Sequence, residues 1–286
     1  MAAMLTGQDP DIPLRDRLRS LRLAVVGHVE WAEFLHVPHL PAAGEITHVI
    51  DRWEAPAGGG AVAAVQLARL AGRATLVTAL GDDDLGHRAA EELQRLGVDV
   101  RAVFRGDQPQ RRVIAHLEPS GERTITVIGD RMGPRGDEGG RIDLDAVYFT
   151  AGDAAAVHAA RSARVLTATA RALATLQEAN VPLDALVRSA LDPGERYEDG
   201  DLSPRPGLVV ATERGAGGRW WRSDGTSGRY DAVEPPGPIR DTYGCGDAFA
   251  AGLTAAIAGG LDIAATLDLG ARCGAWVAAL DGPYGR

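Results

Sequence analysis

Short apolar runs alternate with helical segments along most of this chain, and this alternation constrains its fold more than any other feature. LRLAVVGHVEW (residues 21–31) contains an apolar run that ends in Gly27, and ATLVTALG (74–81) ends in a second glycine. Both have the pattern of buried strands. The alternation resumes after about residue 141. The pattern predicts an α/β fold, with a doubly wound, mostly parallel sheet flanked by helices.

The predicted helices carry start and stop signals. GGGAVAAVQLARLAG (58–72) is led by glycine, rich in small residues and closed by a glycine. DDDLGHRAAEELQRLGV (82–98) begins with acidic residues, which stabilise a helix N-terminus, and stops at Gly97. Two further helices are predicted near the C-terminus, over 247–260 and 264–280. In sheets of this kind ligands gather at the carboxyl ends of the strands.

One part of the chain departs from this alternation. VDVRAVFR (98–105), RRVIAHLEP (111–119) and RTITVIGD (123–130) have the pattern of short strands, and turn signals rather than helices separate them. EITHVIDRW (45–53) also partly alternates as an antiparallel strand does. These stretches predict a small β-sheet lid, formed from about 41–57 and 98–130.

Composition limits the function classes open to the protein. With 286 residues, 45% of them hydrophobic, the chain can form one large domain, predicted over 19–286 after a mobile tail at 1–18. The net charge is −9, which argues against nucleic acid or a membrane surface as partner. There is no lysine, so a P-loop lysine and a Schiff-base lysine are excluded. Two cysteines and the lack of a signal or membrane-spanning segment predict a cytoplasmic protein.

The loop DTYGCGDAFAAG (241–252) leads into one of the last helices and combines glycines with a carboxylate. A helix N-terminus offers unpaired N–H groups, and glycines let an anion approach them closely. Asp247 at this position could accept the proton of a hydroxyl group that attacks a phosphoryl group. The alternative is an ordinary glycine turn in which Asp247 is a first-turn helix residue.

The loop, D-T-x-G-x-G-D followed by a small-residue helix, resembles the C-terminal signature of the ribokinase-like (PfkB) carbohydrate kinases. GGGAVAAVQLARLAG resembles the N-terminal Gly-Gly signature of that family, and GDDDLGHRAAEELQRLGVDV resembles the segment that usually follows it. The resemblance extends over most of the chain. It implies a doubly wound α/β domain with a β-sheet lid over the sugar.

The resemblance assigns roles to the loop. It implies that Asp247 is the catalytic base and that the loop amides form an anion hole. Those amides belong to Gly244, Cys245 and Gly246. Asp241 and Thr242 would shape the loop beside the nucleotide and, in some relatives, a K⁺ site. Cys245 stands where many relatives have alanine. It is interpreted as a small substitute, with an oxidisable thiol of lowered pKa as the alternative.

The resemblance also implies a metal site and a nucleotide site. Asp192 and Glu195 stand where the family commonly has Asn-x-x-Glu, and carboxylates acting through water suit Mg²⁺. The alternative for this segment is a surface turn. Thr212 and Gly217 fall at nucleotide-site positions, whereas Arg214 stands where a glycine is expected.

The sugar side matches the family less well. Gly58 and Gly59 fit the Gly-Gly pair that approaches substrate hydroxyls. Ala63 and Ala32 stand where relatives have a polar asparagine and aspartate, which leaves Glu30 as the main polar candidate. His28 and Glu33 are further candidates. Trp31 is interpreted as a buried aromatic rather than a stacking platform.

The predicted activity is ATP-dependent phosphorylation of a primary hydroxyl on a sugar or sugar-like small molecule. The predicted lid carries Arg111, Arg112 and Arg123, and such cations could hold the phosphate of a substrate that is already phosphorylated. Two alternatives remain: a nucleoside kinase of the same fold, and a non-catalytic sugar- or nucleotide-binding protein on this scaffold. The exposed lid sheet also suggests a homodimer formed through the lid.

Overall fold

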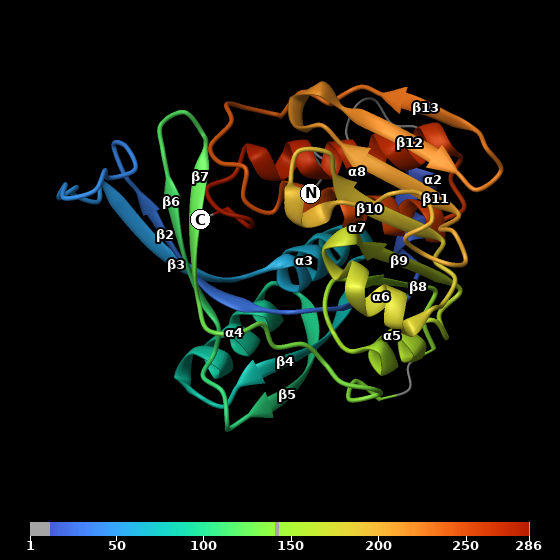
Figure 1. Ribbon diagram of the computed structural model, residues 1–286, viewed down its shortest axis with the longest axis horizontal. Helices are drawn as coiled ribbons and strands as arrows, with labels where there is room; N and C mark the ends of the chain where they lie inside the picture. Colours follow the sequence, from blue (N-terminus) through green and yellow to red (C-terminus); the bar gives the residue numbers. More distant parts are fainter. Residues whose placement is uncertain (1–11, 141–142, 286) are drawn as a thin grey trace.

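A nine-stranded sheet forms the centre of the protein in the computed structural model, which describes residues 12–140 and 143–285 (Figure 1). The strand order is β13-β12-β11-β10-β9-β8-β1-β4-β5. The seven strands from β11 to β5 run parallel, and β12 and β13 add an antiparallel edge. The strands are β1 (Leu23–Val26), β4 (Ala74–Gly81), β5 (Val98–Arg105), β8 (Ala146–Phe149), β9 (Val165–Thr169), β10 (Ala185–Ser189), β11 (Leu208–Thr212), β12 (Gly218–Arg222) and β13 (Ser227–Tyr230).

Helices cover both faces of this sheet, which confirms the doubly wound arrangement. On one face lie α2 (Ile12–Arg19), α3 (Gly59–Ala71), α4 (Asp84–Arg95), α7 (Cys245–Ala258) and α8 (Ile263–Ala278). The other face carries α5 (Ala154–Ala160) and α6 (Leu173–Ala179). Val25 and Val26, neighbours in β1, belong to the two different cores, because successive side chains of a strand point to opposite faces.

A separate four-stranded sheet, the lid, projects from the α/β domain on the left of Figure 1. Its order is β3-β2-β6-β7, built from β2 (Glu30–His36), β3 (Asp51–Ala57), β6 (Arg112–Leu117) and β7 (Arg123–Ile128). One face of the lid is apolar. Phe34 and Val113 on this face form a small core with Val62 of α3 and with Tyr243, from the loop that precedes α7. The lid is thus packed onto the start of two helices.

The strands of the lid differ from those predicted. Residues 98–105 form β5, which pairs in parallel with β4 in the main sheet. The helix α4 between these strands is the reason, because a strand–helix–strand unit returns the second strand beside the first. Residues 41–50 contain no strand, and the lid includes β2, which sequence patterning joined to the first strand. The prediction of a small separate sheet is confirmed, and β3, β6 and β7 lie within the predicted ranges, whereas residues 41–50 and 98–105 do not belong to this sheet.

The N-terminal segment also differs from its prediction. The mobile tail was expected to reach residue 18, and residues 1–11 lie outside the described residues. Residues 12–19 form α2, and Leu18 is fully buried in the core that also contains α3. An apolar side chain on a short amphipathic helix explains this docking. Residues 12–18 therefore belong to the folded domain.

Two observations bear on partners of the protein. Within the described residues, no helix is both long and apolar enough to cross a bilayer. All six residues of the edge strand β7 are exposed. The homodimer through the lid stays a prediction, which sedimentation velocity can test.

Candidate active site

Helix α7 begins at Cys245, and its first turn is the centre of the candidate site. Gly244 has a φ of 79°, and a Cβ there would lie 2.8 Å from Cγ1 of Val62, so backbone and packing both require glycine. A Cβ on Gly246 would meet nothing within 4 Å. The first i-to-i+4 bond of the helix runs from Ala248 N–H to the Gly244 carbonyl, 2.9 Å. Among the earlier amides, Cys245 N–H donates a long hydrogen bond to the Thr242 carbonyl (3.5 Å), and a helix start of this kind can receive an anion.

Asp247 projects from this first turn toward the start of α3. A Cβ on Gly59 would lie 2.7 Å from Oδ1 of Asp247, so only glycine leaves room for the carboxylate. Asp247 is half-buried by surface area, but protein surrounds it closely. Burial raises the pKa of Asp247 to about 7, and the charge of Glu195 acts in the same direction, while Arg171 and Arg123 oppose both. A carboxyl with this pKa can exchange a proton near neutral pH.

A buried polar chain connects the Gly-Gly turn to the lid. The Tyr243 hydroxyl accepts a hydrogen bond from the Gly58 N–H (3.2 Å) and donates to Oε1 of Glu30 (3.0 Å). Oε2 of Glu30 accepts from Nε of Arg111 (2.9 Å). Glu30 is 7% exposed and Tyr243 is 5% exposed. Gly58 and Glu30, both predicted to bind substrate, therefore lie in contact, and the Glu30 charge is compensated by an arginine.

His28 lies against the same glycines and was only a secondary candidate in the sequence. A Cβ on Gly59 would lie 3.5 Å from its Cε1, and one on Gly58 would lie 3.1 Å from its Cδ2. Burial lowers the pKa of His28 to about 3, and the charges of Arg131, Arg111 and Arg171 act in the same direction. The imidazole is neutral at physiological pH. Within the described residues its Nδ1 has no hydrogen-bond partner.

Asp241 and Thr242 hold the loop in place. Oδ1 of Asp241 accepts from the Tyr243 N–H and Oδ2 accepts from the Gly282 N–H, each at 2.7 Å. This fully buried carboxylate therefore pins the loop to the C-terminal segment. Nη1 of Arg123, from lid strand β7, donates to the Thr242 carbonyl (2.8 Å) and to its hydroxyl (2.7 Å). The lid and the loop are directly linked.

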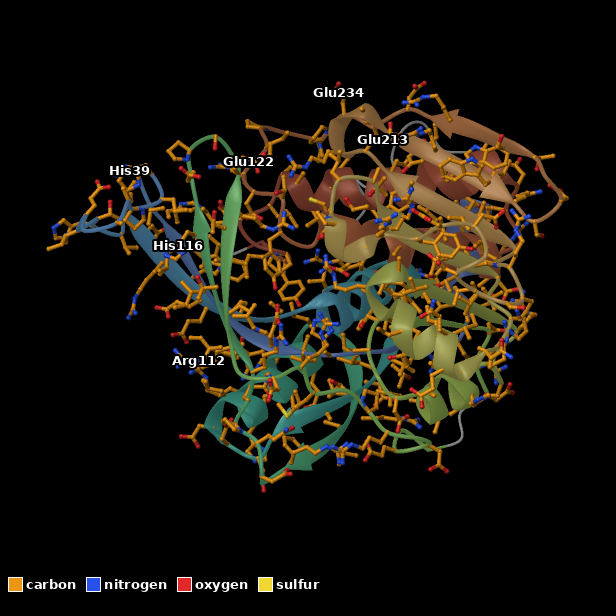
Figure 2. All side chains as sticks on the ribbon, viewed as in Figure 1. His39, Arg112, His116, Glu122, Glu213 and Glu234 are labelled. Carbon is orange, nitrogen blue, oxygen red and sulfur yellow. The ribbon has the colours of Figure 1, made fainter. Side chains whose placement is uncertain are left out.

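The predicted nucleotide-side residues lie at the carboxyl end of β11. Thr212 is its last residue, and Gly217 joins the turn η3 (Arg214–Ala216) to β12. A Cβ on Gly217 would lie 2.1 Å from the Tyr230 carbonyl oxygen, and Gly217 has a φ of 78°. Arg214, where a glycine was expected, has a φ of 54°, so it keeps the glycine-type backbone conformation. Its Nη1 lies 3.1 Å from Oε1 of Glu122 at the tip of the lid, which Figure 2 labels.

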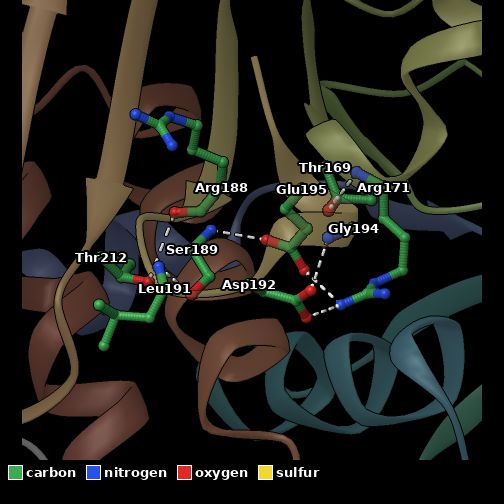
Figure 3. Close-up of polar contacts among 9 residues, drawn as sticks. All are labelled: Thr169, Arg171, Arg188, Ser189, Leu191, Asp192, Gly194, Glu195 and Thr212. Carbon is green, nitrogen blue, oxygen red and sulfur yellow. Dashed lines mark hydrogen bonds and ion pairs between the residues drawn. The ribbon is translucent and has the colours of Figure 1, made fainter.

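Asp192 and Glu195, the predicted magnesium ligands, follow β10 around the short turn η2 (Pro193–Glu195), and both form ion pairs with Arg171 (Figure 3). Oε1 of Glu195 lies 2.9 Å from Nη2 of Arg171, and Oε2 accepts from the Ser189 N–H (2.6 Å). Two carboxylates are a donor set that suits Mg²⁺ held through water. A cation bound between Asp192 and Glu195 would share these carboxylates with Arg171. The described residues contain no cluster of three or more His, Cys, Asp or Glu side chains placed to hold a metal ion.

Two sequence-based alternatives for single side chains are resolved. Burial raises the pKa of the Cys245 thiol to about 12, so the alternative of a reactive helix-start thiol with a lowered pKa is wrong. Trp31 is buried, with the Arg88 guanidinium 4.3 Å from its ring centroid and its Nε1 donating to Glu54. The interpretation of Trp31 as a packed aromatic is confirmed.

Arginines in and around the lid divide into two groups. Arg111 and Arg123 contact the site through Glu30 and Thr242, whereas Arg112 is exposed on the lid, on the side away from the α/β domain (Figure 2). Two arginines that sequence reasoning missed, Arg131 and Arg171, also lie near Asp247. Arg171 follows a predicted strand directly, so the rule that ligands gather at strand carboxyl ends could have singled it out.

Comparison with known proteins gives a consistent result. Residues 20–197 and 204–284 match the model of a family described as pfkB family carbohydrate kinase. The ATP-dependent ribose-1-phosphate kinase of Halopiger xanaduensis is 29% identical over 289 residues, which cover 92% of this chain and 93% of that protein.

Solved structures resemble this fold over nearly their whole length. The ribokinase of Cryptococcus neoformans var. grubii, solved with ADP, has a TM-score of 0.72 at 19% identity, over 93% of this chain and 97% of that chain. The nucleoside kinase of Burkholderia thailandensis, solved with inosine, has a TM-score of 0.73 at 17% identity, over 91% and 92% of the two chains. These similarities show a shared fold.

Proposed function

Because this chain belongs to the pfkB family of carbohydrate kinases, we propose that it transfers the γ-phosphoryl group of ATP to a primary hydroxyl of a sugar or sugar-like molecule, with Asp247 as the base. The position of Asp247 carries the proposal. Its carboxylate shares the first turn of α7 with the amides of the helix start and touches Gly59 of the Gly-Gly turn.

In the proposed reaction the acceptor hydroxyl oxygen attacks the γ-phosphorus, and the bond from that phosphorus to the bridging oxygen of ADP breaks. Asp247 takes the hydroxyl proton, and its pKa of about 7 matches this task at neutral pH. The amides of Gly244, Cys245 and Gly246 face the transferring phosphoryl group and stabilise its charge. Gly58, Gly59 and Glu30 bind the acceptor.

The nucleotide is proposed to lie between α7 and the end of β11. Thr212 and Gly217 border this side, and Asp241 and Thr242 fix the loop that faces it. The lid is tied down there by the Arg214–Glu122 ion pair and by Arg123. A lid held over the site excludes water, which favours transfer to the acceptor over hydrolysis of ATP.

Asp192 and Glu195 would hold Mg²⁺ through water, and the ion, when bound, neutralises phosphate charge. If turnover requires K⁺, the ion would bind beside the loop at Asp241. Both carboxylate oxygens of Asp241 already accept hydrogen bonds from backbone N–H groups. Turnover measured with and without K⁺ tests this point.

An acceptor panel tests the proposed function. ADP release is measured with ribose, fructose, ribose 1-phosphate (the substrate class named for the Halopiger relative) and the nucleoside inosine. We expect ADP formation with a sugar-type acceptor and its loss in Asp247→Asn, with nucleotide binding retained. Faster turnover of inosine than of every sugar would favour the nucleoside kinase alternative. Tight sugar binding without transfer to any acceptor would favour a non-catalytic role.

A further inference from the structure

A polar cavity of about 310 Å³ lies beside the proposed active site. Its walls come from four places: the end of β5, the chain that leaves the lid after β7, the end of β8 and the turn after β9. Three of these are carboxyl ends of strands in the parallel sheet, where ligands of α/β proteins bind. The lining includes four arginines and one carboxylate: Arg105, Arg131, Arg135, Arg171 and Asp153.

Among the described residues, two of these arginines have protein partners and two have none. Arg105 forms hydrogen bonds to both carboxylate oxygens of Glu138 (2.9 and 2.7 Å), and Arg171 pairs with the carboxylates of η2. Within residues 12–140 and 143–285, the guanidinium groups of Arg131 and Arg135 form no hydrogen bond and no ion pair. Oδ1 of Asp153 accepts from two backbone N–H groups. Arg131 and Arg135 are exposed to solvent, and the lining of the cavity carries more positive than negative side chains.

A buried hydroxyl adds an independent sign of a missing ligand. Thr150 lines the cavity, is 2% exposed, and its Oγ1 has no hydrogen-bond partner among the described residues. The oxygen lies against Gly27, where a Cβ would come within 2.1 Å of it. An unsatisfied buried hydroxyl costs free energy unless a ligand or water supplies its partner.

The cavity is electrostatically coupled to the proposed reaction centre. Partial burial lowers the pKa of Arg131, the positive charges of Arg111 and Arg171 act in the same direction, and Glu30 and Asp247 oppose these effects. The charge of Arg131 therefore interacts with both the proposed acceptor-binding carboxylate and the proposed base. Arg171, which lines the cavity, also acts on Asp247, so the cavity and the proposed base share a charged neighbour.

We propose that the cavity binds a phosphate monoester carried by the acceptor, with Arg131 as its main contact and Arg171, Arg135 and Thr150 around it. This inference rests on the proposed kinase function and narrows its substrate to sugars that already bear one phosphate. A phosphate monoester carries about −1.5 to −2 charges at pH 7, which matches the two guanidinium groups that have no partner among the described residues. Arginine also binds phosphate oxygens through two parallel N–H groups. A carboxylate brings only one charge.

Matched pairs of acceptors test the site. The value of kcat/KM is measured for ribose against ribose 1-phosphate and for fructose against fructose 1-phosphate, each with a free primary hydroxyl. The wild type should prefer one or both monophosphates by more than about tenfold. Arg131→Met should lower kcat/KM for the preferred monophosphate by about 10- to 100-fold, mainly by raising KM. The value of kcat/KM for the parent sugar should change by less than about threefold. Arg131→Lys should restore part of the loss.

Arg222→Met, which removes an exposed arginine of β12 far from the cavity, is the matched control and should behave as the wild type. Calorimetry with the monophosphates and no nucleotide gives a second readout, and Arg131→Met should weaken their binding. Thermal unfolding shows whether Arg131→Met is folded.

The outcomes separate the two proposals. Turnover of free sugars at rates equal to or above those of their monophosphates would refute the phosphate site and leave the kinase function intact. An equal loss of both acceptor classes in Arg131→Met would also refute it, as would a preference for a sugar acid over the monophosphates. Monophosphate binding that depends on Arg131, without transfer to any acceptor, would support the site and refute the kinase. Neither binding nor transfer would refute both.

Discussion

Replacing Asp247 with asparagine tests both the proposed base and the origin of its raised pKa. The carboxyl has a pKa of about 7 in place of the ordinary 3.8, chiefly because burial disfavours the charged form. Between about pH 4 and pH 7 the folded protein therefore binds this proton more tightly than the unfolded chain does. The free energy of unfolding falls as the pH rises through this window, and asparagine, which does not ionise, avoids the loss.

The size of the effect follows from the pKa. A shift of about 3 units corresponds to ~4 kcal/mol above pH 7, at 1.36 kcal/mol per unit. Because Asp247 is only half-buried, solvent screens part of its charge, and we expect Asp247→Asn to raise the free energy of unfolding by ~1–2 kcal/mol at pH 8. At pH 4.5 roughly a quarter of that gain should remain.

Urea unfolding at pH 4.5, 6 and 8 measures the gain, and coupled ADP release measures turnover in the same variant. Turnover should fall ~10²- to 10⁴-fold, the usual contribution of a general base. Asp231→Asn, which removes an exposed carboxylate elsewhere, is the control. A stability difference that does not change with pH would refute the burial argument. Wild-type turnover in Asp247→Asn would refute the role as base.

Three further predictions concern neighbours of this carboxylate. The value of kcat/KM for the acceptor should fall about tenfold per unit below pH 7 and level off above pH 8, because the proposed base, Asp247, acts in its ionised form. Gly59→Ala places a Cβ 2.7 Å from Oδ1 of Asp247, so kcat should fall by about 100-fold, while Gly237→Ala, which meets open space, should leave it unchanged. Tyr243→Phe removes the 3.0 Å hydrogen bond to buried Glu30. The free energy of unfolding should therefore fall by ~1–3 kcal/mol, and KM for the acceptor should rise. An unchanged KM would argue against acceptor binding by Glu30.

Local signals were sufficient to predict most of the main domain. The glycine-led segment 58–72 forms α3 with Gly72 as its left-handed C-cap, and the acid-started segment 82–98 forms α4 with Asp83 as its N-cap. Such signals act within a few residues, since glycine permits positive φ and an aspartate side chain accepts from the first turn of a helix. For the same reason the loop before α7 could be recognised from its residues alone.

Strand partners were harder to predict than strands. Residues 98–105 have the pattern of a half-exposed strand, and this pattern is the same at the edge of a parallel sheet and in a lid. The choice of partner depends on the crossover through α4, and β2 joins the lid through pairing with β6, more than 75 residues away in the chain. Periodicity carries no information about either pairing.

The sequence by itself determined the α/β class, the glycine turn at 58–59 and the helix start that carries Asp247, because each rests on backbone preferences of adjacent residues. Only the tertiary structure decided that Asp247 meets Gly59, that Arg171 pairs with both carboxylates of η2, and that Arg131 has no ion-pair partner within the described part of the chain. Burial and Coulomb interactions set these properties, and both depend on segments brought together from distant parts of the chain. The chemistry of the site is therefore a property of the assembled fold.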